Sequence, residues 1–362
     1  GTAHFANLGK APHLLVAGAT GSGKSVSIHS IITSLLYRNP PDQLRFIMVD
    51  PKRVELTIYN HIPHLLTPVI TDAKKAIMAL RWTAKEMDRR YDILEKEAVR
   101  DIESYHKGVV EPSYAKAASE GRPAEEDLPD RMPYIVIIID ELADMMSIYP
   151  REMEAGIVRL AQMSRAVGIH LLLSTQRPSV EIITGLIKAN IPSRIALQVA
   201  SQIDSRTILD MAGAEKLLGS GDMLYLSGDM SKPIRLQSAF ISEHEVKQVV
   251  AWLKNHYRGE IPQDISIGGG SGEGIRVGGG SGFMDESAAD DDDLYEEARA
   301  IVLQAGKASA SYLQRRLKVG YARAARLLDM LEERNVIGPG DGAKPREILD
   351  RSNPSEERDL NA

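Results

Sequence analysis

The sequence predicts an α/β domain with a mostly parallel sheet, followed by a small winged helix-turn-helix domain. Over residues 1–257, apolar runs typical of buried strands alternate with segments of helical periodicity, an order that favours parallel pairing. The first apolar run leads directly into a glycine-rich loop and then a helical segment. A three-helix pattern over residues 294–350, closed by a hairpin signal, predicts the second domain.

Six apolar runs are the candidate strands of the first domain. Helical patterns over 26–36, 73–97 and 151–166 separate them. The run 135–139 consists of β-branched residues only, which predicts a strand covered on both faces. Residues 99–130 are polar and are predicted to form a mobile surface insertion. The candidate strands are 13–17, 45–50, 135–139, 170–174, 194–199 and 223–226.

Residues 18–25 fit the phosphate-binding pattern G-x-x-x-x-G-K-[ST], between a strand and a helix as that pattern requires. Glycines allow the backbone to wrap around phosphates with successive N–H groups pointing inward. Lys24 is expected to reach the β- and γ-phosphates of ATP, and Ser25 to ligate Mg²⁺. The alternative, a chance glycine-rich turn, is disfavoured by this context. The expected ATP-binding residues are Gly18, Ala19, Thr20, Gly21, Ser22, Gly23, Lys24 and Ser25.

Two later candidate strands end on polar residues that suit nucleotide hydrolysis. Asp140 follows the buried run 135–139 and is expected to hold Mg²⁺ opposite Ser25. Glu141 is placed to polarise a water for attack on the γ-phosphate, which suits hydrolysis better than phosphoryl transfer. Gln176, at the end of the next strand, is expected to sense the γ-phosphate or orient that water. The alternatives are an ordinary acidic strand end and an ordinary polar strand end.

The composition of the chain excludes some classes of site and disfavours some classes of protein. The chain has 362 residues, a formal net charge of −6 and no cysteine. Thiolate metal sites and disulfides are therefore excluded, and any nucleic-acid contact must come from local basic patches. Aromatic residues make up 5% of the chain, which disfavours a single-strand binder that stacks bases. No apolar run approaches the length of a membrane span, so no membrane contact is expected of this chain, and its start at Gly1 predicts a fragment.

Composition also predicts the domain boundaries. A segment rich in Gly, Ser and Asp, which repeats the pentamer Gly-Gly-Gly-Ser-Gly, is expected to be a flexible linker because it cannot bury enough apolar surface. A polar C-terminal segment is expected to be a disordered tail. The expected parts are a domain over 1–257, a linker over 258–293, a winged-helix domain over 294–350 and a tail over 351–362.

The second domain carries a predicted nucleic-acid face. Residues 309–328 contain five basic residues and no acidic one. Positions 322, 326 and 329 fall on one face of the third predicted helix, where an arginine at 326 reads guanine in the major groove. A winged helix used for protein contact is the alternative. The basic residues are Arg315, Arg316, Lys318, Arg323 and Arg326.

Several motifs, in this order along the chain, closely resemble those of the FtsK/SpoIIIE family of DNA translocases. The resemblance covers nearly the whole chain, including the C-terminal winged helix, which is called the γ domain in that family. The motifs are residues 18–25, Asp50-Pro51-Lys52, and residues 62–66, 140–144, 174–178, 205–210 and 213–219.

The resemblance implies a RecA-like P-loop ATPase that assembles as a homo-hexameric ring around double-stranded DNA, with ATP and Mg²⁺ between subunits. The residues alone offer Arg165, Arg194 and Arg206 as an arginine finger that acts on a neighbouring subunit's ATP, and do not choose among them. By position in the family's motifs, Arg194 resembles this finger. Residues 202–206, which include Arg206, and the turn that carries Lys232 and Arg235 resemble pore loops that touch the DNA backbone. A solvated hairpin is the alternative for the second of these.

The resemblance also implies a role: ATP-driven DNA translocation in chromosome segregation at cell division or sporulation. The γ domain is expected to recognise polar guide sequences and to contact a site-specific tyrosine recombinase. Ala322 and Asp329 depart from the family's best-known reading residues, so the preferred sequence can differ. This fragment is expected in the cytoplasm, whereas full-length members are anchored in the cell membrane at the division septum. The DNA-contacting residues expected in the γ domain are Arg315, Arg316, Arg323, Arg326 and Asp329.

Two other functions are compatible with parts of the sequence. A conjugation or secretion motor with a related core moves protein or single-stranded DNA, although the winged helix argues against it. A non-catalytic DNA-binding regulator with a relic nucleotide site is the other, and the intact Lys24, Ser25, Asp140 and Glu141 argue against it.

Overall fold

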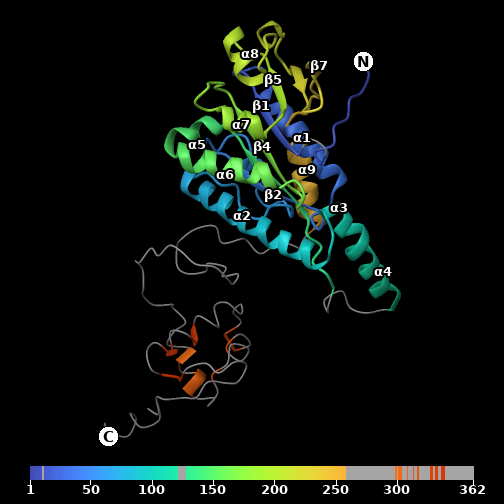
Figure 1. Ribbon diagram of the computed structural model, residues 1–362, viewed down its shortest axis with the longest axis vertical. Helices are drawn as coiled ribbons and strands as arrows, with labels where there is room; N and C mark the ends of the chain where they lie inside the picture. Colours follow the sequence, from blue (N-terminus) through green and yellow to red (C-terminus); the bar gives the residue numbers. More distant parts are fainter. Residues whose placement is uncertain are drawn as a thin grey trace. The chain divides into compact units, whose positions relative to one another are not determined.

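Figure 1 shows the computed structural model of the chain, which describes residues 1–9, 12–120 and 128–257 and short stretches of the C-terminal part. The chain divides into two compact units, residues 1–267 and 268–362, and each is described by itself. The described positions of the second unit are 298–299, 301–303, 308, 313, 316–317, 327–328, 331–332 and 336–338.

The first unit, over its described residues, is built on a seven-stranded sheet with the order β2-β3-β4-β1-β5-β6-β7. Neighbours from β2 to β5 run parallel, and β6 and β7 are antiparallel additions at one edge. The predicted, mostly parallel α/β sheet is therefore confirmed. The carboxyl ends of β1, β3 and β4 lie together at one end of the sheet, the usual place for a ligand site. The strands are β1 His13–Ala17, β2 Leu44–Val49, β3 Tyr134–Ile139, β4 Ile169–Thr175, β5 Ser193–Leu197, β6 Asp222–Leu226 and β7 Ile234–Gln237.

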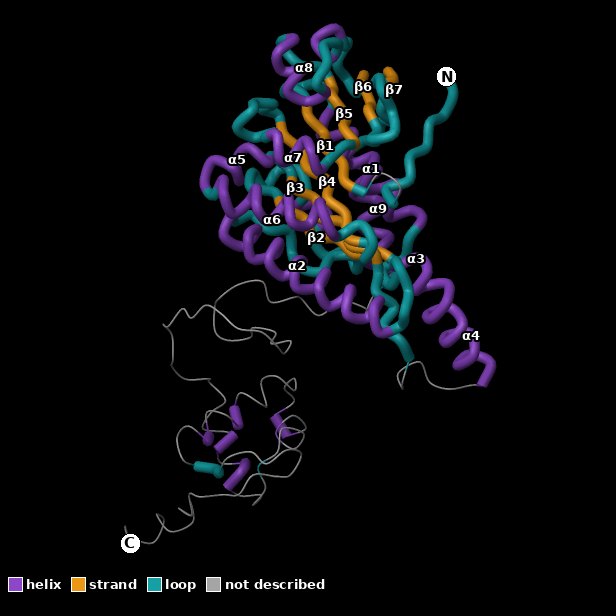
Figure 2. The backbone as a smooth tube through the Cα atoms, viewed as in Figure 1, coloured by secondary structure: helices purple, strands orange, loops and turns teal. Residues whose placement is uncertain are grey.

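Helices cover both faces of this sheet, as Figure 2 shows. Successive side chains of a strand point to opposite faces, so Ile137 of β3 packs into one core cluster and Ile138 into the other. The first cluster includes α2, α5, α6 and α7, and the second includes α1 and α9. Burial on both faces explains the continuous apolar sequence of β3. These helices are α1 Lys24–Arg38, α2 Ala73–Lys96, α5 Leu142–Ile148, α6 Pro150–Met163, α7 Gly185–Asn190 and α9 Glu243–His256.

Residues 102–120 are helical, so the prediction of a mobile surface insertion over 99–130 is wrong for that stretch. Ile102 and Tyr105 are buried in the first core cluster and anchor the segment to the domain. The sequence did not predict the burial of these two residues, because the segment around them is polar. Residues 121–127 lie outside the described residues. The elements are α3 Ile102–Tyr105, the π-helical η2 His106–Val110 and α4 Glu111–Glu120.

Residues 202–206, predicted to be a pore loop, form the start of helix α8 (Gln202–Leu209), so the expectation of a loop there is wrong. The helix begins with a capping box: Asp204 N donates to the Ser201 hydroxyl, and Ser201 N donates to the Asp204 carboxylate. This reciprocal pair satisfies N–H groups that the first turn leaves without partners, which explains why the chain is helical here.

The second unit, over its described residues, has an apolar core of its own. The predicted linker and tail, and most of the predicted wing, lie outside the described residues. None of the helices in the described parts of the chain combines the length and apolar character that crossing a bilayer requires. The buried residues of the second core are Ala298, Val302, Ala308, Leu313, Leu327, Leu328, Leu331, Val336 and Ile337.

Candidate functional site

The glycine-rich loop connects the carboxyl end of β1 to the start of α1. Gly23 has a φ of 98°, and a Cβ placed on it would lie 2.4 Å from the backbone nitrogen of Gly221. That nitrogen donates to the Ser22 carbonyl at 2.8 Å, so a turn before β6 fixes the loop. A residue larger than glycine therefore does not fit at position 23. The backbone of the loop is held in one shape, as a cradle of N–H groups for phosphates requires.

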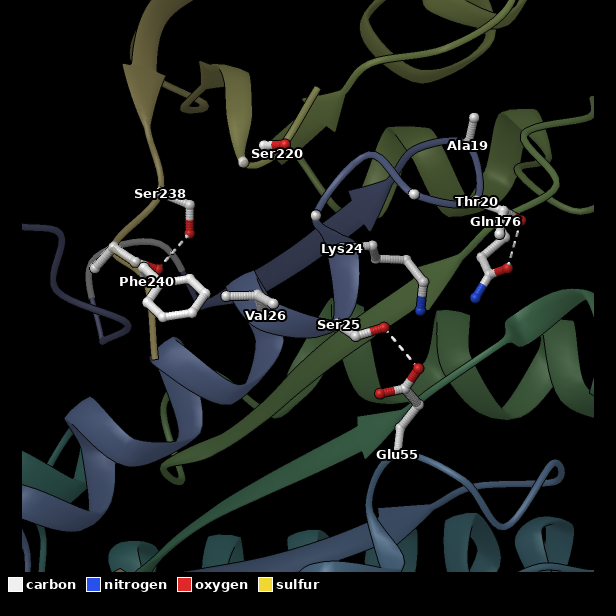
Figure 3. A pocket seen from close by; sticks show the side chains of 14 residues that line it. Ala19, Thr20, Lys24, Ser25, Val26, Glu55, Gln176, Ser220, Ser238 and Phe240 are labelled. Atoms are coloured by element: carbon white, nitrogen blue, oxygen red, sulfur yellow. Dashed lines mark hydrogen bonds between the residues drawn. The ribbon is translucent and has the colours of Figure 1, made fainter. Parts of the chain in front are cut away.

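A cavity of about 420 Å³ lies beside this loop. Figure 3 shows Gln176 and Glu55 on one side of it, and Ser238 and Phe240 on another. Phe240 is 80% exposed, which leaves an apolar ring face open to whatever enters. The lining residues are Ala19, Thr20, Gly21, Gly23, Lys24, Ser25, Val26, Glu55, Gln176, Ser220, Gly221, Ser238, Ala239 and Phe240. Most of the predicted ATP-binding residues therefore share one cavity; Gly18 and Ser22 are not among its lining residues.

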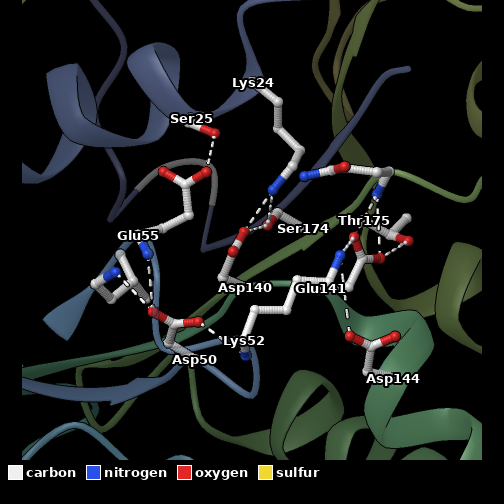
Figure 4. A network of polar contacts seen from close by, with 12 residues as sticks. Lys24, Ser25, Asp50, Lys52, Glu55, Asp140, Glu141, Asp144, Ser174 and Thr175 are labelled. Atoms are coloured by element: carbon white, nitrogen blue, oxygen red, sulfur yellow. Dashed lines mark hydrogen bonds and ion pairs between the residues drawn. The ribbon is translucent and has the colours of Figure 1, made fainter. Parts of the chain in front are cut away.

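Lys24 and Asp140, which the sequence predicts to act together, are in direct contact. The Lys24 amine lies 2.5 Å from an Asp140 carboxylate oxygen and 3.2 Å from the Ser174 hydroxyl. The Ser174 hydroxyl donates to the same carboxylate at 2.7 Å. All three side chains are buried. Asp140 and Ser174 thus hold the positive charge of Lys24 beside the loop, as Figure 4 shows.

Ser25, the predicted Mg²⁺ ligand, donates its hydroxyl hydrogen to Glu55 at 2.6 Å. Glu55 belongs to the loop that follows β2. A hydrogen bond from His29 is the main cause that lowers the pKa of Glu55 below its ordinary value. The carboxylate therefore stays ionised next to the hydroxyl. His29 in turn lies 2.9 Å from the Tyr59 hydroxyl.

Glu141, the predicted general base, is fully buried and has a φ of 57°, an unusual backbone conformation for a residue with a side chain. Its carboxylate accepts hydrogen bonds from the Thr175 hydroxyl at 2.8 Å and from Gln176 N at 3.2 Å. The Lys52 amine lies 3.0 Å from its other oxygen (Figure 4). Burial alone raises the pKa of Glu141, but the bonds from Thr175, Lys52 and Gln176 bring it below the ordinary value.

Gln176 lies beside the glycine-rich loop, as the sequence predicts. The Thr20 hydroxyl donates to the Gln176 side-chain oxygen at 3.0 Å. The backbone nitrogen of Gln176 binds Glu141, so one residue contacts both the loop and the predicted base.

The oxygen atoms of Ser25 and Asp140 fit a Mg²⁺ site. They are a hydroxyl and a carboxylate beside a phosphate-binding loop, and Mg²⁺ prefers hard oxygen ligands completed by phosphates and water.

Arg194, the predicted arginine finger, is held inside the domain. Its side chain donates to the backbone carbonyls of Lys188 at 2.7 Å, Ile191 at 3.2 Å and Ile208 at 3.3 Å, and it pairs with Asp210 at 2.6 Å. The residue is 8% exposed. To act on a neighbouring subunit's ATP, the guanidinium has to leave these partners, so the finger role stays a prediction.

The predicted DNA contacts of the first unit lie on α8 and on the β6–β7 hairpin, which Figure 1 shows at the same end of this unit. Arg206 and Lys232 are exposed. Arg235 forms a two-pronged ion pair with Asp222, at 2.9 and 2.7 Å, which engages its guanidinium within the hairpin. In the second unit Arg316 is exposed. Arg315, Arg323, Arg326 and Asp329 lie outside the described residues.

Sequence reasoning gave no role to several residues of the site, although Lys52 belongs to one of the motifs that resemble the family. Lys52 and Glu55 follow β2 and contact Glu141 and Ser25, and Phe240 forms a wall of the cavity. For Lys52 a signal existed, because a polar residue just after the carboxyl end of a parallel strand reaches the same end of the sheet as the loop. For Phe240, which follows a short edge strand far along the chain, the sequence holds no comparable signal.

Two family models match this chain. The FtsK/SpoIIIE family matches residues 1–180, and the Ftsk gamma domain matches residues 289–351. The chain is 53% identical over 348 residues to the DNA translocase FtsK of Caldanaerobacter subterraneus subsp. tengcongensis. It is 50% identical over 354 residues to the DNA translocase SpoIIIE of Bacillus subtilis. The alignments cover 95% and 96% of this chain but 44% and 42% of those relatives, so the chain spans less than half of their length.

Two solved structures resemble this chain in fold. The conjugation coupling protein TcpA of pCW3, determined with ATPγS, is 28% identical with a TM-score of 0.55, and the match covers 68% of this chain and 66% of that chain. The cytoplasmic domain of the type VII secretion ATPase EccC of Thermomonospora curvata is 24% identical with a TM-score of 0.54, over 72% of this chain and 30% of that chain. The second likeness concerns the fold alone. The predicted fold, a P-loop ATPase core, is confirmed.

Proposed function

Because this chain belongs to the FtsK/SpoIIIE family and has the fold of a P-loop ATPase, we propose that it hydrolyses ATP to move double-stranded DNA. The observation that carries the proposal is the meeting of Lys24, Asp140 and Glu141 beside the glycine-rich loop. A phosphate-binding cation, a metal-binding carboxylate and a base are the groups that ATP hydrolysis needs. The gamma-domain match over residues 289–351 supports DNA as the partner.

ATP binds in the cavity with its phosphates against the N–H groups of the loop. Lys24 exchanges its ion pair with Asp140 for the β- and γ-phosphates. Ser25 and Asp140 would hold Mg²⁺, and the ion would neutralise phosphate charge there. The base of the nucleotide lies against the exposed ring of Phe240, because aromatic faces stack favourably on such rings.

Glu141 acts as the general base. As the oxygen of the attacking water bonds to the γ-phosphorus, Glu141 accepts a proton from that water, and the bond between the γ-phosphorus and the ADP oxygen breaks. The lowered pKa keeps Glu141 ionised at neutral pH, so it is ready to accept this proton. Gln176, between the loop and the base, orients the water or senses the γ-phosphate.

The DNA partner is bound in two ways in this proposal. The first units form a homo-hexameric ring with double-stranded DNA in its pore, and Arg206, Lys232 and Arg235 contact phosphates, which repeat along any sequence. Arg194 is the proposed finger toward the neighbouring subunit, which requires its internal contacts to open. The second unit reads polar guide sequences through Arg326.

The cellular role in this proposal is chromosome segregation at cell division or sporulation. The motor works in the cytoplasm, and the whole protein is anchored in the cell membrane at the division septum. A site-specific tyrosine recombinase is the proposed protein partner of the second unit.

The test is ATP turnover by the purified chain with and without long duplex DNA. We expect duplex DNA to stimulate hydrolysis strongly. The variant Lys24→Ala should lose ATP binding, and Glu141→Gln should bind ATP without turnover because it cannot accept the proton. The proposal is contradicted if duplex DNA does not change the rate of ATP hydrolysis at concentrations where the ring forms, or if Glu141→Gln hydrolyses ATP at the wild-type rate.

The likeness to TcpA, at 28% identity, makes a conjugation-type motor the second candidate. The same assay separates the two, because a motor for single-stranded DNA responds to single strands and a protein motor to neither nucleic acid. The gamma-domain match favours duplex DNA.

A further inference from the structure

We propose that the loop from Asp50 to Glu55 is a positioning element that serves both halves of the ATP site. Its Lys52 fixes the carboxylate of Glu141, and its Glu55 fixes the hydroxyl of Ser25. This inference rests on the proposed ATP hydrolysis and assigns it two further residues. Neither residue touches the reacting atoms; each acts through the residue that it contacts.

The loop is held rigidly by one buried carboxylate. Asp50 is fully buried at the end of β2, and its two oxygens accept hydrogen bonds from the backbone nitrogens of Lys52 at 3.1 Å, Glu55 at 3.0 Å and Leu56 at 2.9 Å. Leu56 is itself fully buried in the second core cluster. A carboxylate that binds several backbone N–H groups fixes the turn, so both side chains leave the loop from defined positions.

Lys52 completes the set of groups that hold Glu141. The Thr175 hydroxyl binds one oxygen of the carboxylate, and the Lys52 amine binds the other at 3.0 Å. Lys52 is 36% exposed and also lies 3.9 Å from Asp144, so its amine bridges the buried base and the surface. With a partner on each oxygen the carboxylate cannot rotate about its last bond. Without Lys52 the oxygen that it binds keeps only the Gln176 N–H at 3.3 Å and loses its charged partner, so the base is held less firmly in its direction.

Glu55 determines how Ser25 presents its lone pairs. The Ser25 hydroxyl donates its hydrogen to Glu55, so its oxygen lone pairs are left for a metal ion. His29 lies 3.7 Å from Glu55 and is itself held at 2.9 Å by the Tyr59 hydroxyl, so the acceptor is supported in turn. Groups that orient a metal ligand in this way typically change metal affinity by about 10- to 100-fold when they are removed.

Figure 4 shows the two arms of the loop reaching the two sides of the Lys24–Asp140 pair. One short segment thus contacts the residue that holds the metal ion and the residue that accepts the proton. Binding and chemistry are expected to separate when the arms are changed one at a time: Lys52 affects turnover, and Glu55 affects metal affinity.

The first arm is tested by steady-state ATP hydrolysis of Lys52→Met, Lys52→Arg and a control, Lys74→Met, which changes an exposed lysine of α2. We expect Lys52→Met to lower kcat about 10- to 100-fold while KM changes less than about twofold, because only the base is misplaced. Lys52→Arg keeps the positive charge and should recover most of kcat. An unchanged kcat in Lys52→Met, or equal losses in Met and Arg, overturns the role of Lys52.

The second arm is tested by Mn²⁺ binding to the chain with ADP bound, followed by electron paramagnetic resonance, so no hydrolysis is needed. We expect Glu55→Ala to weaken Mn²⁺ binding about 10- to 100-fold. Glu55→Gln, which keeps an acceptor oxygen, should weaken it less, and the exposed Glu103→Gln should not change it. Thermal unfolding of each variant shows whether it is folded. Mn²⁺ affinity that stays at the wild-type value in Glu55→Ala overturns the role of Glu55.

The measurements distinguish the proposed ATP hydrolysis from the positioning role of the loop. A wild-type chain that hydrolyses no ATP contradicts the proposed function. A wild-type chain that hydrolyses ATP, with Lys52 and Glu55 variants that match their controls, contradicts the positioning role alone.

Discussion

Lys24, Ser25 and Glu141 each contact a charged residue of the same chain. Lys24 pairs with Asp140, Ser25 with Glu55 and Glu141 with Lys52. The Lys24–Asp140 pair is buried on both sides, and in the Lys52–Glu141 pair only the carboxylate is buried. Because an unpaired buried charge is costly, each of these partners stabilises the site. In the proposed mechanism, ATP binding exchanges the partner of Lys24, whereas the contacts of Ser25 and Glu141 persist.

The sequence predicted the residues of the site that follow strands and left out those that depend on loop shape. Lys24 belongs to a motif of fixed spacing, and Asp140 and Gln176 stand directly after strands whose carboxyl ends meet. Glu55 reaches Ser25 only because Asp50 folds the intervening residues into a tight loop. Such a conformation depends on one buried carboxylate rather than on periodicity, so the apolar pattern does not predict it.

Phe240 provides a prediction at the scale of one side chain. We expect Phe240→Ala to weaken ATP and ADP binding about 2- to 13-fold, because a stacked ring contributes about 0.5–1.5 kcal/mol. Affinity for tripolyphosphate, which has no base, should not change. Calorimetric titration of both ligands measures the difference, with Trp252→Ala as the control because that exposed ring of α9 is not among the residues that line the cavity. An equal loss for tripolyphosphate and ATP rejects a base contact.

At the scale of elements, the structure confirms what continuous apolar patterns predicted. The buried strands of the parallel sheet and the long helix α2 lie within a few residues of their predicted bounds. The misses are short or polar elements. β7 alternates partly exposed residues at a sheet edge, and α3 is fixed by the burial of Ile102 and Tyr105. These elements form because of tertiary contacts, which a local pattern does not contain.

Arg194 connects α7, β5 and α8, and this leads to a prediction about stability. We expect Arg194→Ala to lower the free energy of unfolding by about 2–4 kcal/mol, because it removes the donor of three backbone carbonyl groups, two of them in buried contacts, and leaves Asp210 with Lys188 alone. Chemical denaturation of the chain at low concentration, without ATP or DNA, measures this effect. Arg206→Ala, at an exposed site of α8, should change stability by less than about 0.5 kcal/mol. Wild-type stability in Arg194→Ala shows that its contacts are weak enough to open for a finger role.

At the scale of the whole molecule, the chain holds two compact units with separate cores. The first unit has two core layers around one sheet, and its candidate site lies where the strands end.

Two buried histidines of that sheet make the free energy of unfolding of the first unit sensitive to pH. His13 of β1 and His170 of β4 lie in neighbouring strands, with ring centroids 6.4 Å apart. Burial is the main cause that lowers their pKa, to about 3 for His13 and about 4 for His170.

Stability is expected to fall as the pH is lowered from about 7 to 5. In that window the unfolded chain protonates these histidines, whose ordinary pKa is 6.5, whereas the folded chain keeps them neutral, so protons favour unfolding. Each histidine contributes a loss of about 2 kcal/mol between pH 7 and pH 5. The variant His170→Phe, which preserves an aromatic ring next to Tyr134, should reduce the pH dependence by about that amount, whatever its stability at pH 7. Denaturation curves at pH 7, 6 and 5 measure it, with the exposed His244→Gln as the control. If His170→Phe and the wild type show the same pH dependence, His170 is not the source of the effect, because the protons taken up on unfolding then bind to other groups.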